Sequence, residues 1–354
     1  MSKYMSKRHA NLTAYVPGEQ PQDKKYVKLN TNESPFPPSP LAQRLARQAA
    51  GTIELYCDPE CGALVKIAAE KFGVSSDEIL FTNGSDEILD FAFAAFCDEN
   101  TPAVFPDITY GFYPVFATRN GVPYHEIPLK EDLTVDVRDY LGVKGTVFIA
   151  NPNAPTGIAL PASDIEKIVA SDPSRVVVVD EAYVDFGGES VLPLIKKYDN
   201  LLVTQTFSKS RSLAGGRLGM GFASAALIAD LKKIKYSFNP YNVNSMTAAA
   251  GIGALLDEEY FKTNAETIIK TREDAVLALD ALGFTSLPTK ANFIFAKHAK
   301  LSGRSVYSAL KDKGVLVRYF DKDRLQDYVR ITVGSAEDMR ILTEMLADII
   351  GERK

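Results

Sequence analysis

The chain has 354 residues, of which 46% are hydrophobic and 24% are charged, and this ordinary globular composition argues against extensive disorder. The formal net charge of -5, without blocks of lysine or arginine, argues against nucleic acid as a partner. No apolar run reaches the roughly 18 residues of a membrane-spanning helix, and the first residues lack the apolar stretch of a signal peptide. We therefore expect a cytoplasmic protein without membrane association.

The cysteine content excludes a disulfide framework. Cys57, Cys61 and Cys97 are an odd and sparse set for a chain of this size. Cys57 and Cys61 could be read as a metal-binding pair, but none of the three histidines lies near them in the sequence. We predict free thiols in a reducing compartment and no metal site.

Residues 1–40 are polar and rich in proline, which favours an extended arm. From residue 41 to about 255, helical patterns alternate with short, continuously apolar runs, which is typical of strands buried on both faces. We therefore predict an α/β domain over 41–255, with a mainly parallel sheet flanked by helices. Its strands are expected in ILFTNG, PAVFPD, GTVFIANP, RVVVVDEA, NLLVTQTFS and LGMGFAS.

The stretch 257–282 contains no proline or glycine before Gly283 and places apolar residues at helical spacing, so it predicts one long helix that links two domains. Strand-like segments then alternate with helical ones as far as the last helix, which is expected from about Ser335. This pattern predicts a smaller α+β domain over 256–354. Its strands are expected in ANFIFAKH, GVLVRYF and YVRITVG, and another helix at 303–313.

Ligands of open α/β sheets bind beyond the carboxyl ends of the strands, so polar residues after apolar runs are candidate site residues. In RVVVVDEAY, four valines end at Asp180. A buried carboxyl is costly to ionise unless it meets a cation, and the protonated ring nitrogen of a pyridine cofactor is a suitable one. The alternative is that Asp180 caps the next helix.

A second strand end, in LLVTQTFSKSRSLAGGRLG, carries Ser208 and Lys209, with Arg217 beyond a pair of glycines. A partly desolvated lysine near another cation has a lowered pKa, which suits imine formation with an aldehyde cofactor. Ser208 and Arg217 could then hold the phosphate of that cofactor. Taken alone, Lys209 could equally be an ordinary solvated lysine.

Two further turns follow predicted strands. In FTNGSDEIL, the strand turns through Gly84 into a helix that opens with Ser85 and Asp86, and free N–H groups at a helix start bind phosphate. Any strand-to-helix junction has this appearance. In IANPNAPTGIALP, two prolines, two asparagines and a glycine follow the strand, more than a simple turn requires.

Three segments together, NPNAPTG (151–157), DEAY (180–183) and FSKSRSLAGGRLG (207–219), resemble the signature of class I and II aminotransferases, which depend on pyridoxal 5'-phosphate (PLP). The resemblance extends from KLNTNESPFPPSP (28–40) to YVRITVG (328–334), and within the superfamily it is strongest to the histidinol-phosphate aminotransferases. It implies the type I fold of PLP-dependent transferases, with 41–255 as the PLP-binding domain.

The resemblance implies a role for each matching residue. Lys209 would form the Schiff base and carry the proton between the substrate Cα and the cofactor, and Asp180 would pair with the pyridine nitrogen. Tyr183 would bond the 3-hydroxyl of the cofactor, and Tyr110 would stack on its ring. The phosphate cup would consist of Gly84, Ser85, Asp86, Ser208 and Arg217, with Tyr56 contributed across the interface of a homodimer.

On the substrate side, the resemblance assigns Arg330 to the substrate carboxylate, as the fork geometry of a guanidinium favours. The alternative is a surface arginine on an edge strand. Arg318 and Tyr15 would help to hold a substrate phosphate, and Asn32 would line the same pocket.

One position departs from the family pattern, because Ala154 stands where many members have an asparagine that bonds the 3-hydroxyl of the cofactor. We predict that Asn153 reaches the same oxygen, with Tyr183 acting alone as the alternative. The loss of one neutral hydrogen bond costs only about 1 kcal/mol, so the cofactor assignment does not depend on this contact.

The expected partners are a small-molecule amino donor and a 2-oxo acid, with histidinol phosphate and 2-oxoglutarate implied by the resemblance. Three alternatives are a threonine-phosphate decarboxylase, a broad aromatic aminotransferase, and a non-catalytic protein that binds PLP. The last is disfavoured because the chain keeps Asp180, Lys209, Arg217 and Arg330 together.

Overall fold

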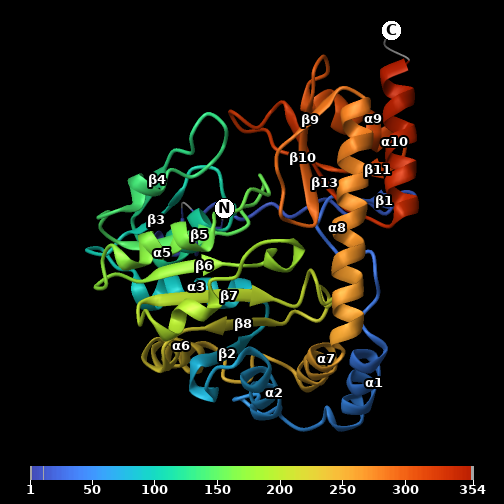
Figure 1. The fold of residues 1–354 in the computed structure, drawn as a ribbon. Coiled ribbons are helices and arrows are strands. Elements are labelled where there is room, and N and C mark those ends of the chain that lie inside the picture. Colours follow the sequence, from blue (N-terminus) through green and yellow to red (C-terminus); the bar gives the residue numbers. More distant parts are fainter. Residues whose placement is uncertain (1, 11, 352–354) are drawn as a thin grey trace.

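A seven-stranded sheet forms the centre of the computed structural model, which describes residues 2–10 and 12–351. The strand order is β2-β8-β7-β6-β5-β3-β4, and only β8 runs antiparallel to its neighbours, which confirms the predicted mainly parallel sheet. Figure 1 shows helices on both sides of it. The strands are β2 (Ile79–Thr82), β3 (Ala103–Pro106), β4 (Tyr124–Ile127), β5 (Thr146–Ala150), β6 (Val177–Asp180), β7 (Leu201–Thr206) and β8 (Gly219–Phe222).

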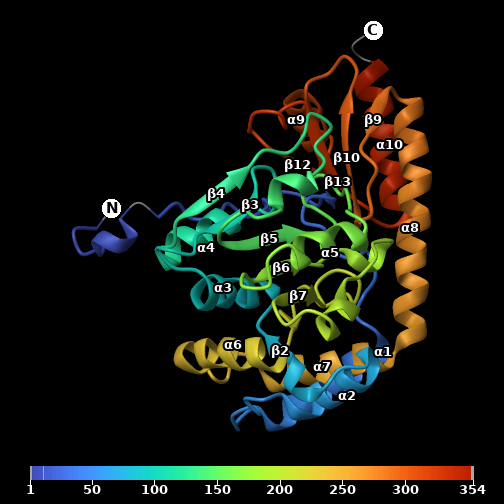
Figure 2. The same ribbon diagram turned by 60° about the vertical axis from the view of Figure 1, so that its left-hand side comes forward.

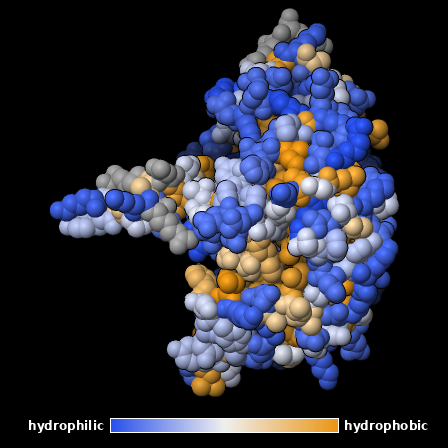
Figure 3. Space-filling view, turned by 90° about the vertical axis from the view of Figure 1, so that its left-hand side faces the viewer, coloured by the Kyte–Doolittle hydropathy of each residue, from blue (hydrophilic) through white to orange (hydrophobic). Residues whose placement is uncertain are grey.

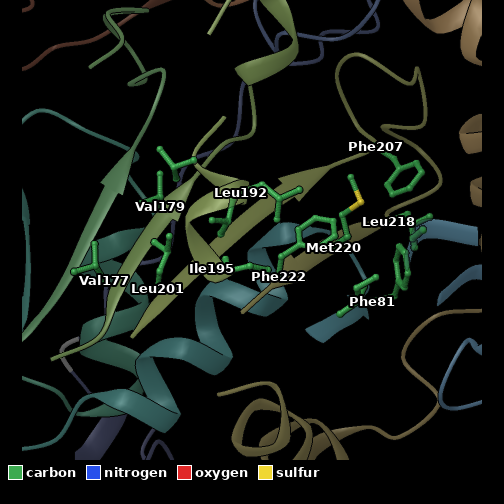
Figure 4. Packing of buried hydrophobic residues seen from close by; sticks show 14 of the residues in the cluster. Phe81, Val177, Val179, Leu192, Ile195, Leu201, Phe207, Leu218, Met220 and Phe222 are labelled. Carbon is green, nitrogen blue, oxygen red and sulfur yellow. The ribbon is translucent and has the colours of Figure 1, made fainter. Parts of the chain in front are cut away.

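Both faces of the sheet are buried. Along β6, Val177 and Val179 belong to the hydrophobic cluster shown in Figure 4, whereas Val178 belongs to a second cluster on the opposite face. The six predicted strands are confirmed. They could be recognised because strands covered on both faces have continuously apolar sequences. The edge strand β4 is mostly exposed and polar, so the sequence pattern did not reveal it.

Seven helices pack around the sheet or precede it along the chain. Helix α1 begins at Pro40, where Ser39 accepts a hydrogen bond from the amide of Ala42, as is typical of a helix start. Helix α2 ends at Phe72 and is followed by Gly73, whose φ of 66° suits glycine. Their bounds are α1 (Pro40–Ala49), α2 (Gly62–Phe72), α3 (Ser85–Phe96), α4 (Tyr113–Asn120), α5 (Ala162–Ala170), α6 (Ala225–Phe238) and α7 (Ser245–Leu256).

The predicted long helix is confirmed as α8 (Glu258–Ala281), which runs along the large sheet and the small C-terminal part in Figures 1 and 2. The C-terminal part has a four-stranded antiparallel sheet with the order β12-β13-β10-β9 and its own hydrophobic cluster. The domain boundaries of the sequence analysis remain predictions. The elements are β9 (Phe284–Ser286), β10 (Phe293–His298), α9 (Gly303–Asp312), β11 (Val315–Leu316), β12 (Arg318–Tyr319), β13 (Tyr328–Thr332) and α10 (Ala336–Gly351).

The N-terminal arm is mostly extended, as predicted, but it also contains β1 (Val27–Lys28), which pairs in parallel with β11. The start of the chain projects away from the body of the molecule in Figure 2. None of the helices in the described ranges combines the length and the apolar character needed to cross a bilayer. Short 3-10 turns are η1 (Lys7–His9), η2 (Ala50–Thr52), η3 (Ser76–Glu78), η4 (Val137–Tyr140), η5 (Val184–Phe186) and η6 (Leu192–Lys196).

Candidate active site

A cavity of about 600 Å³ lies where the large sheet, the N-terminal arm and the small C-terminal part meet. Ala150, Asp180 and Thr206, the last residues of β5, β6 and β7, line it, so it occupies the carboxyl ends of the parallel strands as expected for this class of fold. The lining includes the following residues named by the sequence analysis: Tyr15, Asn32, Ser85, Asp86, Tyr110, Asp180, Tyr183, Ser208, Lys209, Arg217, Arg318 and Arg330.

Asp180 is 5% exposed, and no salt bridge joins its carboxyl to a cation among residues 2–10 and 12–351. Its Oδ1 accepts hydrogen bonds from the backbone N of Ala182 at 3.2 Å and from Oγ1 of Thr204 at 3.3 Å. The Tyr113 hydroxyl also faces this carboxyl, although no hydrogen bond of good geometry joins them. Burial, together with the nearby Asp86 carboxylate, raises the pKa of Asp180 to about 7. A cation placed at this carboxyl would therefore be bound strongly.

Lys209 lies in the cavity wall, and its Nζ donates a hydrogen bond to the Thr31 carbonyl at 3.3 Å. The ammonium group is 5.9 Å from the centre of the Tyr183 ring. Burial, together with the positive charge of Arg330, lowers the pKa of Lys209 to about 8. The amine is therefore partly unprotonated near neutral pH, which a nucleophile or a proton carrier requires.

The residues that follow Lys209 fix it to the surrounding structure. Ser210 donates a hydrogen bond to the Asp185 carboxylate, in the segment that follows β6. The guanidinium of Arg211 is 4.0 Å from the centre of the Phe261 ring and donates to the Ala254 carbonyl at 3.1 Å. Arg211 therefore anchors the lysine segment to α7 and α8, which the sequence analysis did not foresee.

Several hydrogen-bond donors of the cavity lie at or near the start of α3. Arg217 extends over Gly84, where an added Cβ would come within 2.6 Å of Nη2 of Arg217. Ser208 lines the same cavity, and its backbone N donates a hydrogen bond to Oγ1 of Thr206 at 3.1 Å. A helix N-terminus, a hydroxyl and a guanidinium in one corner suit a phosphate group.

The side chain of Asp86 is engaged by two neighbours, and the phosphate contact that the resemblance implied for this residue stays a prediction. Its two carboxylate oxygens accept hydrogen bonds from the Tyr110 hydroxyl at 2.7 Å and from Nη2 of Arg217 at 3.2 Å. A carboxylate repels phosphate, so the side chain of Asp86 positions Tyr110 and Arg217.

Tyr183 is held by Asn32, which the sequence analysis assigned to the substrate pocket. Nδ2 of Asn32 donates a hydrogen bond to the Tyr183 hydroxyl at 2.9 Å. Asn32 is fixed in turn, because its backbone N donates to Oγ1 of Thr332 at 2.9 Å and its carbonyl accepts from Asn292 at 3.1 Å. The Tyr183 ring packs edge-on against Phe293 with 5.1 Å between the ring centres.

Arg330 and Arg318 lie side by side on the small sheet, where β12 and β13 pair them directly. The Arg330 guanidinium lies within 5.2 Å of the centre of the Phe293 ring and 5.4 Å of that of Phe320, and its Nη2 donates to the Asn30 carbonyl at 3.3 Å. Nε of Arg330 is buried and has no hydrogen-bond partner among the described residues. Arg330 is therefore a part-buried cation in the cavity wall, and the alternative of an ordinary surface arginine is not supported.

The arm closes this side of the cavity. Arg318 donates from Nη1 to the Pro17 carbonyl at 3.1 Å and from Nη2 to the Val16 carbonyl at 3.0 Å. The Tyr15 ring stacks on Phe112 with 4.1 Å between the ring centres. In this structure, Arg318 is therefore occupied by the arm.

Three predicted site residues do not line the cavity, namely Gly84, Asn153 and Tyr56. Gly84 lies directly under the Arg217 guanidinium, which does line it. The amide of Asn153 donates to the Ile108 carbonyl at 3.0 Å and accepts from Thr109 at 2.8 Å. These bonds within the adjoining turns argue against Asn153 as the replacement for the asparagine missing at Ala154.

Tyr56 lies on the outside of the described chain. It is 85% exposed, and its ring stacks on Tyr241 with 4.6 Å between the ring centres. This position is compatible with a contribution to the cavity of a second copy of the chain, which remains a prediction.

The sequence analysis missed several residues that line the cavity, namely Thr31, Glu33, Thr206, Phe320 and Lys322. Thr31 and Glu33 flank Asn32, and Thr206 lies two residues before Ser208, so closeness in sequence was a usable signal. Phe320 likewise lies two residues after Arg318, whereas Lys322, four residues after it in the loop that follows β12, had a weaker signal of this kind.

A family model described as aminotransferase class I and II matches residues 24–346. A histidinol-phosphate aminotransferase of Brachyspira hyodysenteriae is 46% identical over 352 residues, which cover 99% of this chain and 99% of the relative. These matches extend over nearly the whole chain.

Two solved structures are also similar. The histidinol-phosphate aminotransferase of Sinorhizobium meliloti, solved in complex with pyridoxal-5'-phosphate, has a TM-score of 0.86 and 26% identity, and the match covers 94% of this chain and 92% of that protein. The L-threonine-O-3-phosphate decarboxylase of Porphyromonas gingivalis has a TM-score of 0.80, covers 92% and 99% of the two chains, and at 21% identity shares the fold alone. With the family model matched over residues 24–346, the chain belongs to the class I and II aminotransferases.

Proposed function

We propose that this aminotransferase uses PLP to transfer the amino group of L-histidinol phosphate to 2-oxoglutarate, giving imidazole acetol phosphate and L-glutamate, a step of histidine biosynthesis. The relative that is 46% identical over 99% of both chains supports this donor. The cavity supports it independently, because its small-sheet side is arranged for a substrate with more negative charge than one carboxylate.

The observation that carries this proposal is the pairing of Arg318 with Arg330. They occupy directly opposite positions on β12 and β13, and like charges in such positions destabilise a sheet. Their hydrogen-bond acceptors are main-chain carbonyls, at Val16, Pro17 and Asn30. An anion bound between the two guanidiniums would remove the repulsion, and a phosphate dianion would do so more fully than a carboxylate.

The cavity residues fit PLP. Asp180 offers an uncompensated carboxyl for the protonated ring nitrogen, and the corner of Ser208 and Arg217 offers donors for the phosphate. Tyr110 also lines the cavity, and its hydroxyl donates a hydrogen bond to Asp86. When bound, PLP supplies an electron-withdrawing ring that stabilises negative charge at the substrate Cα.

The remaining work falls to side chains of this chain. Nζ of Lys209 would move the proton at the substrate Cα, and its lowered pKa of about 8 suits both uptake and release of a proton. Asp180 holds its cationic partner because burial makes an unpaired carboxylate unfavourable there. The Tyr183 hydroxyl, held by Asn32, remains available to the 3-hydroxyl group of the cofactor. We therefore assign this contact to Tyr183 without Asn153.

We also propose that the enzyme is a homodimer in the cytoplasm, with Tyr56 reaching the partner's cavity. Large hydrophobic side chains are exposed near Tyr56 in the sequence, namely Ile53 and Leu55. Figure 3 shows further hydrophobic residues gathered between the upper and lower parts of one face, beside the projecting N-terminal segment. A second copy of the chain would remove such surface from water.

The test is the cofactor absorbance of the PLP-loaded protein after separate addition of L-histidinol phosphate, L-glutamate, L-phenylalanine and L-threonine phosphate. We expect the first two to convert the aldehyde form to the aminated form, with a weak response to phenylalanine. Release of carbon dioxide from threonine phosphate without a 2-oxo acid would instead support the decarboxylase. The Lys209→Ala variant should give no conversion with any donor.

A further inference from the structure

A third cation on the small-sheet side of the cavity has no role in the function proposed above. Lys322, in the loop between β12 and β13, lines the cavity, and its Nζ donates a hydrogen bond to the main-chain carbonyl of Asp107 at 2.6 Å. Among residues 2–10 and 12–351, no carboxylate forms an ion pair with it. A lysine that is satisfied by a carbonyl alone is free to exchange that partner for an anion.

The charges of the cavity are unevenly distributed. Two of the anionic side chains in its lining already have partners, since Asp86 is bonded to Arg217 and Glu33 to Lys28. Within the described part of the chain, the cations on the small-sheet side donate their hydrogen bonds to carbonyl oxygens. The charged lining residues are Lys209, Arg217, Arg318, Lys322 and Arg330, against Glu33, Asp86 and Asp180.

We propose that Lys322 is a specificity-determining residue, which supplies the third positive charge to the phosphate of a phosphorylated amino donor. The inference rests on the proposed function and extends it. A carboxylate is satisfied by one guanidinium in fork geometry, whereas a phosphate dianion has twice the charge and a further oxygen to bind. The flexible side chain of lysine can move its ammonium group from the Asp107 carbonyl to that oxygen.

The same contact could instead serve only to join the two parts of the molecule, because Asp107 follows β3 of the large sheet. Arg324 makes it possible to separate these roles. It lies in the same loop and donates to Oδ2 of Asp107 at 3.2 Å and to the Leu129 carbonyl at 2.9 Å, but it does not line the cavity. Arg324→Gln therefore weakens the same junction without removing a cation from the cavity.

The experiment compares the PLP-loaded wild type with Lys322→Gln, Lys322→Arg and Arg324→Gln. L-histidinol phosphate and its dephosphorylated analogue L-histidinol serve as donors in single-turnover reactions followed by cofactor absorbance. We expect Lys322→Gln to raise the half-saturating concentration of histidinol phosphate roughly ten-fold, because the variant loses one charge-assisted hydrogen bond to the phosphate. The maximal rate and the half-saturating concentration of histidinol should change by much smaller factors.

Two further measurements sharpen the result. Lys322→Arg should restore most of the preference for the phosphorylated donor, because it keeps the charge. Inorganic phosphate should compete with histidinol less effectively in Lys322→Gln than in the wild type, which reports on the anion site without turnover of a phosphorylated substrate.

The inference about Lys322 is overturned if Lys322→Gln weakens both donors by the same factor, or if Arg324→Gln lowers the donor preference equally. Either result would assign Lys322 to the junction between the two parts. If the wild type itself shows no preference for histidinol phosphate over histidinol, the proposed donor falls, and the role of Lys322 falls with it.

Discussion

Replacement of Asp180 by asparagine should stabilise the cofactor-free protein while removing a residue that the reaction needs. The carboxyl is 5% exposed and accepts hydrogen bonds on Oδ1 from Ala182 and Thr204. The amide oxygen of asparagine has the same size and position and can accept both. The substitution therefore removes the cost of a buried negative charge and little else.

The magnitude follows from the pKa of Asp180, which burial raises from its ordinary value of 3.8 to about 7. Below pH 4, the carboxyl is protonated in the folded and the unfolded chain, and it costs nothing. As the pH rises from about 4 to 7, the unfolded chain loses the proton and the folded chain keeps it, so the folded state loses roughly 1.4 kcal/mol per pH unit. Above pH 7, the full cost is about 4 kcal/mol at most.

Thermal unfolding of the cofactor-free wild type and Asp180→Asn at pH 5 and pH 8 measures this directly. The free energy of unfolding of the variant should exceed that of the wild type by about 3 kcal/mol more at pH 8 than at pH 5. For a chain of this length, this corresponds to about 4 °C in Tm. Asp98→Asn is the control, because the backbone amides of Asn100 and Thr101 lower the pKa of that exposed carboxyl, and its removal should give no such gain. A difference in Tm between Asp180→Asn and wild type that does not grow with pH would refute the reasoning.

Two further predictions concern cofactor binding. The rate at which the cofactor-free protein takes up PLP should rise with pH and level off near pH 8, because the unprotonated amine attacks the aldehyde and burial, with Arg330, lowers the pKa of Lys209 to about 8; a rate that climbs towards pH 10 would contradict it. Gly84→Ala should weaken PLP binding roughly ten-fold or more in an equilibrium titration, because its φ of 82° disfavours a side chain and the new Cβ would displace Arg217. Gly51→Ala, with open space around it, should bind PLP as the wild type does.

The elements that the sequence predicted correctly are those whose signal is local. A strand buried on both faces has a continuously apolar sequence, such as the four valines before Asp180. A polar residue that follows such a run lies at the carboxyl edge of the parallel sheet. Asp180, Ser208 and Lys209 therefore line the cavity as expected from position alone. The β4 edge strand is exposed and lacks that signal.

Contacts between distant segments could not be predicted in the same way. The prediction that Asn153 bonds the 3-hydroxyl of the cofactor relied on its position next to Ala154. In the structure, the turn directs its amide to Ile108 and Thr109. The amide that does reach Tyr183 comes from Asn32 in the arm, which is held there by Thr332 of the last strand. Such a partner depends on the packing of three segments that no single sequence pattern describes.

Arg272 of α8 makes contacts that the helical pattern of its sequence does not predict. It is a buried guanidinium whose Nη1 donates to the carbonyls of Phe186 and Ala291, both at 2.8 Å. Phe186 ends the turn that follows Tyr183, and Ala291 comes just before the strand that carries Phe293, the ring against which Tyr183 packs. A buried cation bonded only to carbonyls is costly, so its position implies a use. Arg272 of α8 therefore connects the turn after Tyr183 with the segment before β10, a contact between distant residues that the apolar spacing of the helix does not indicate.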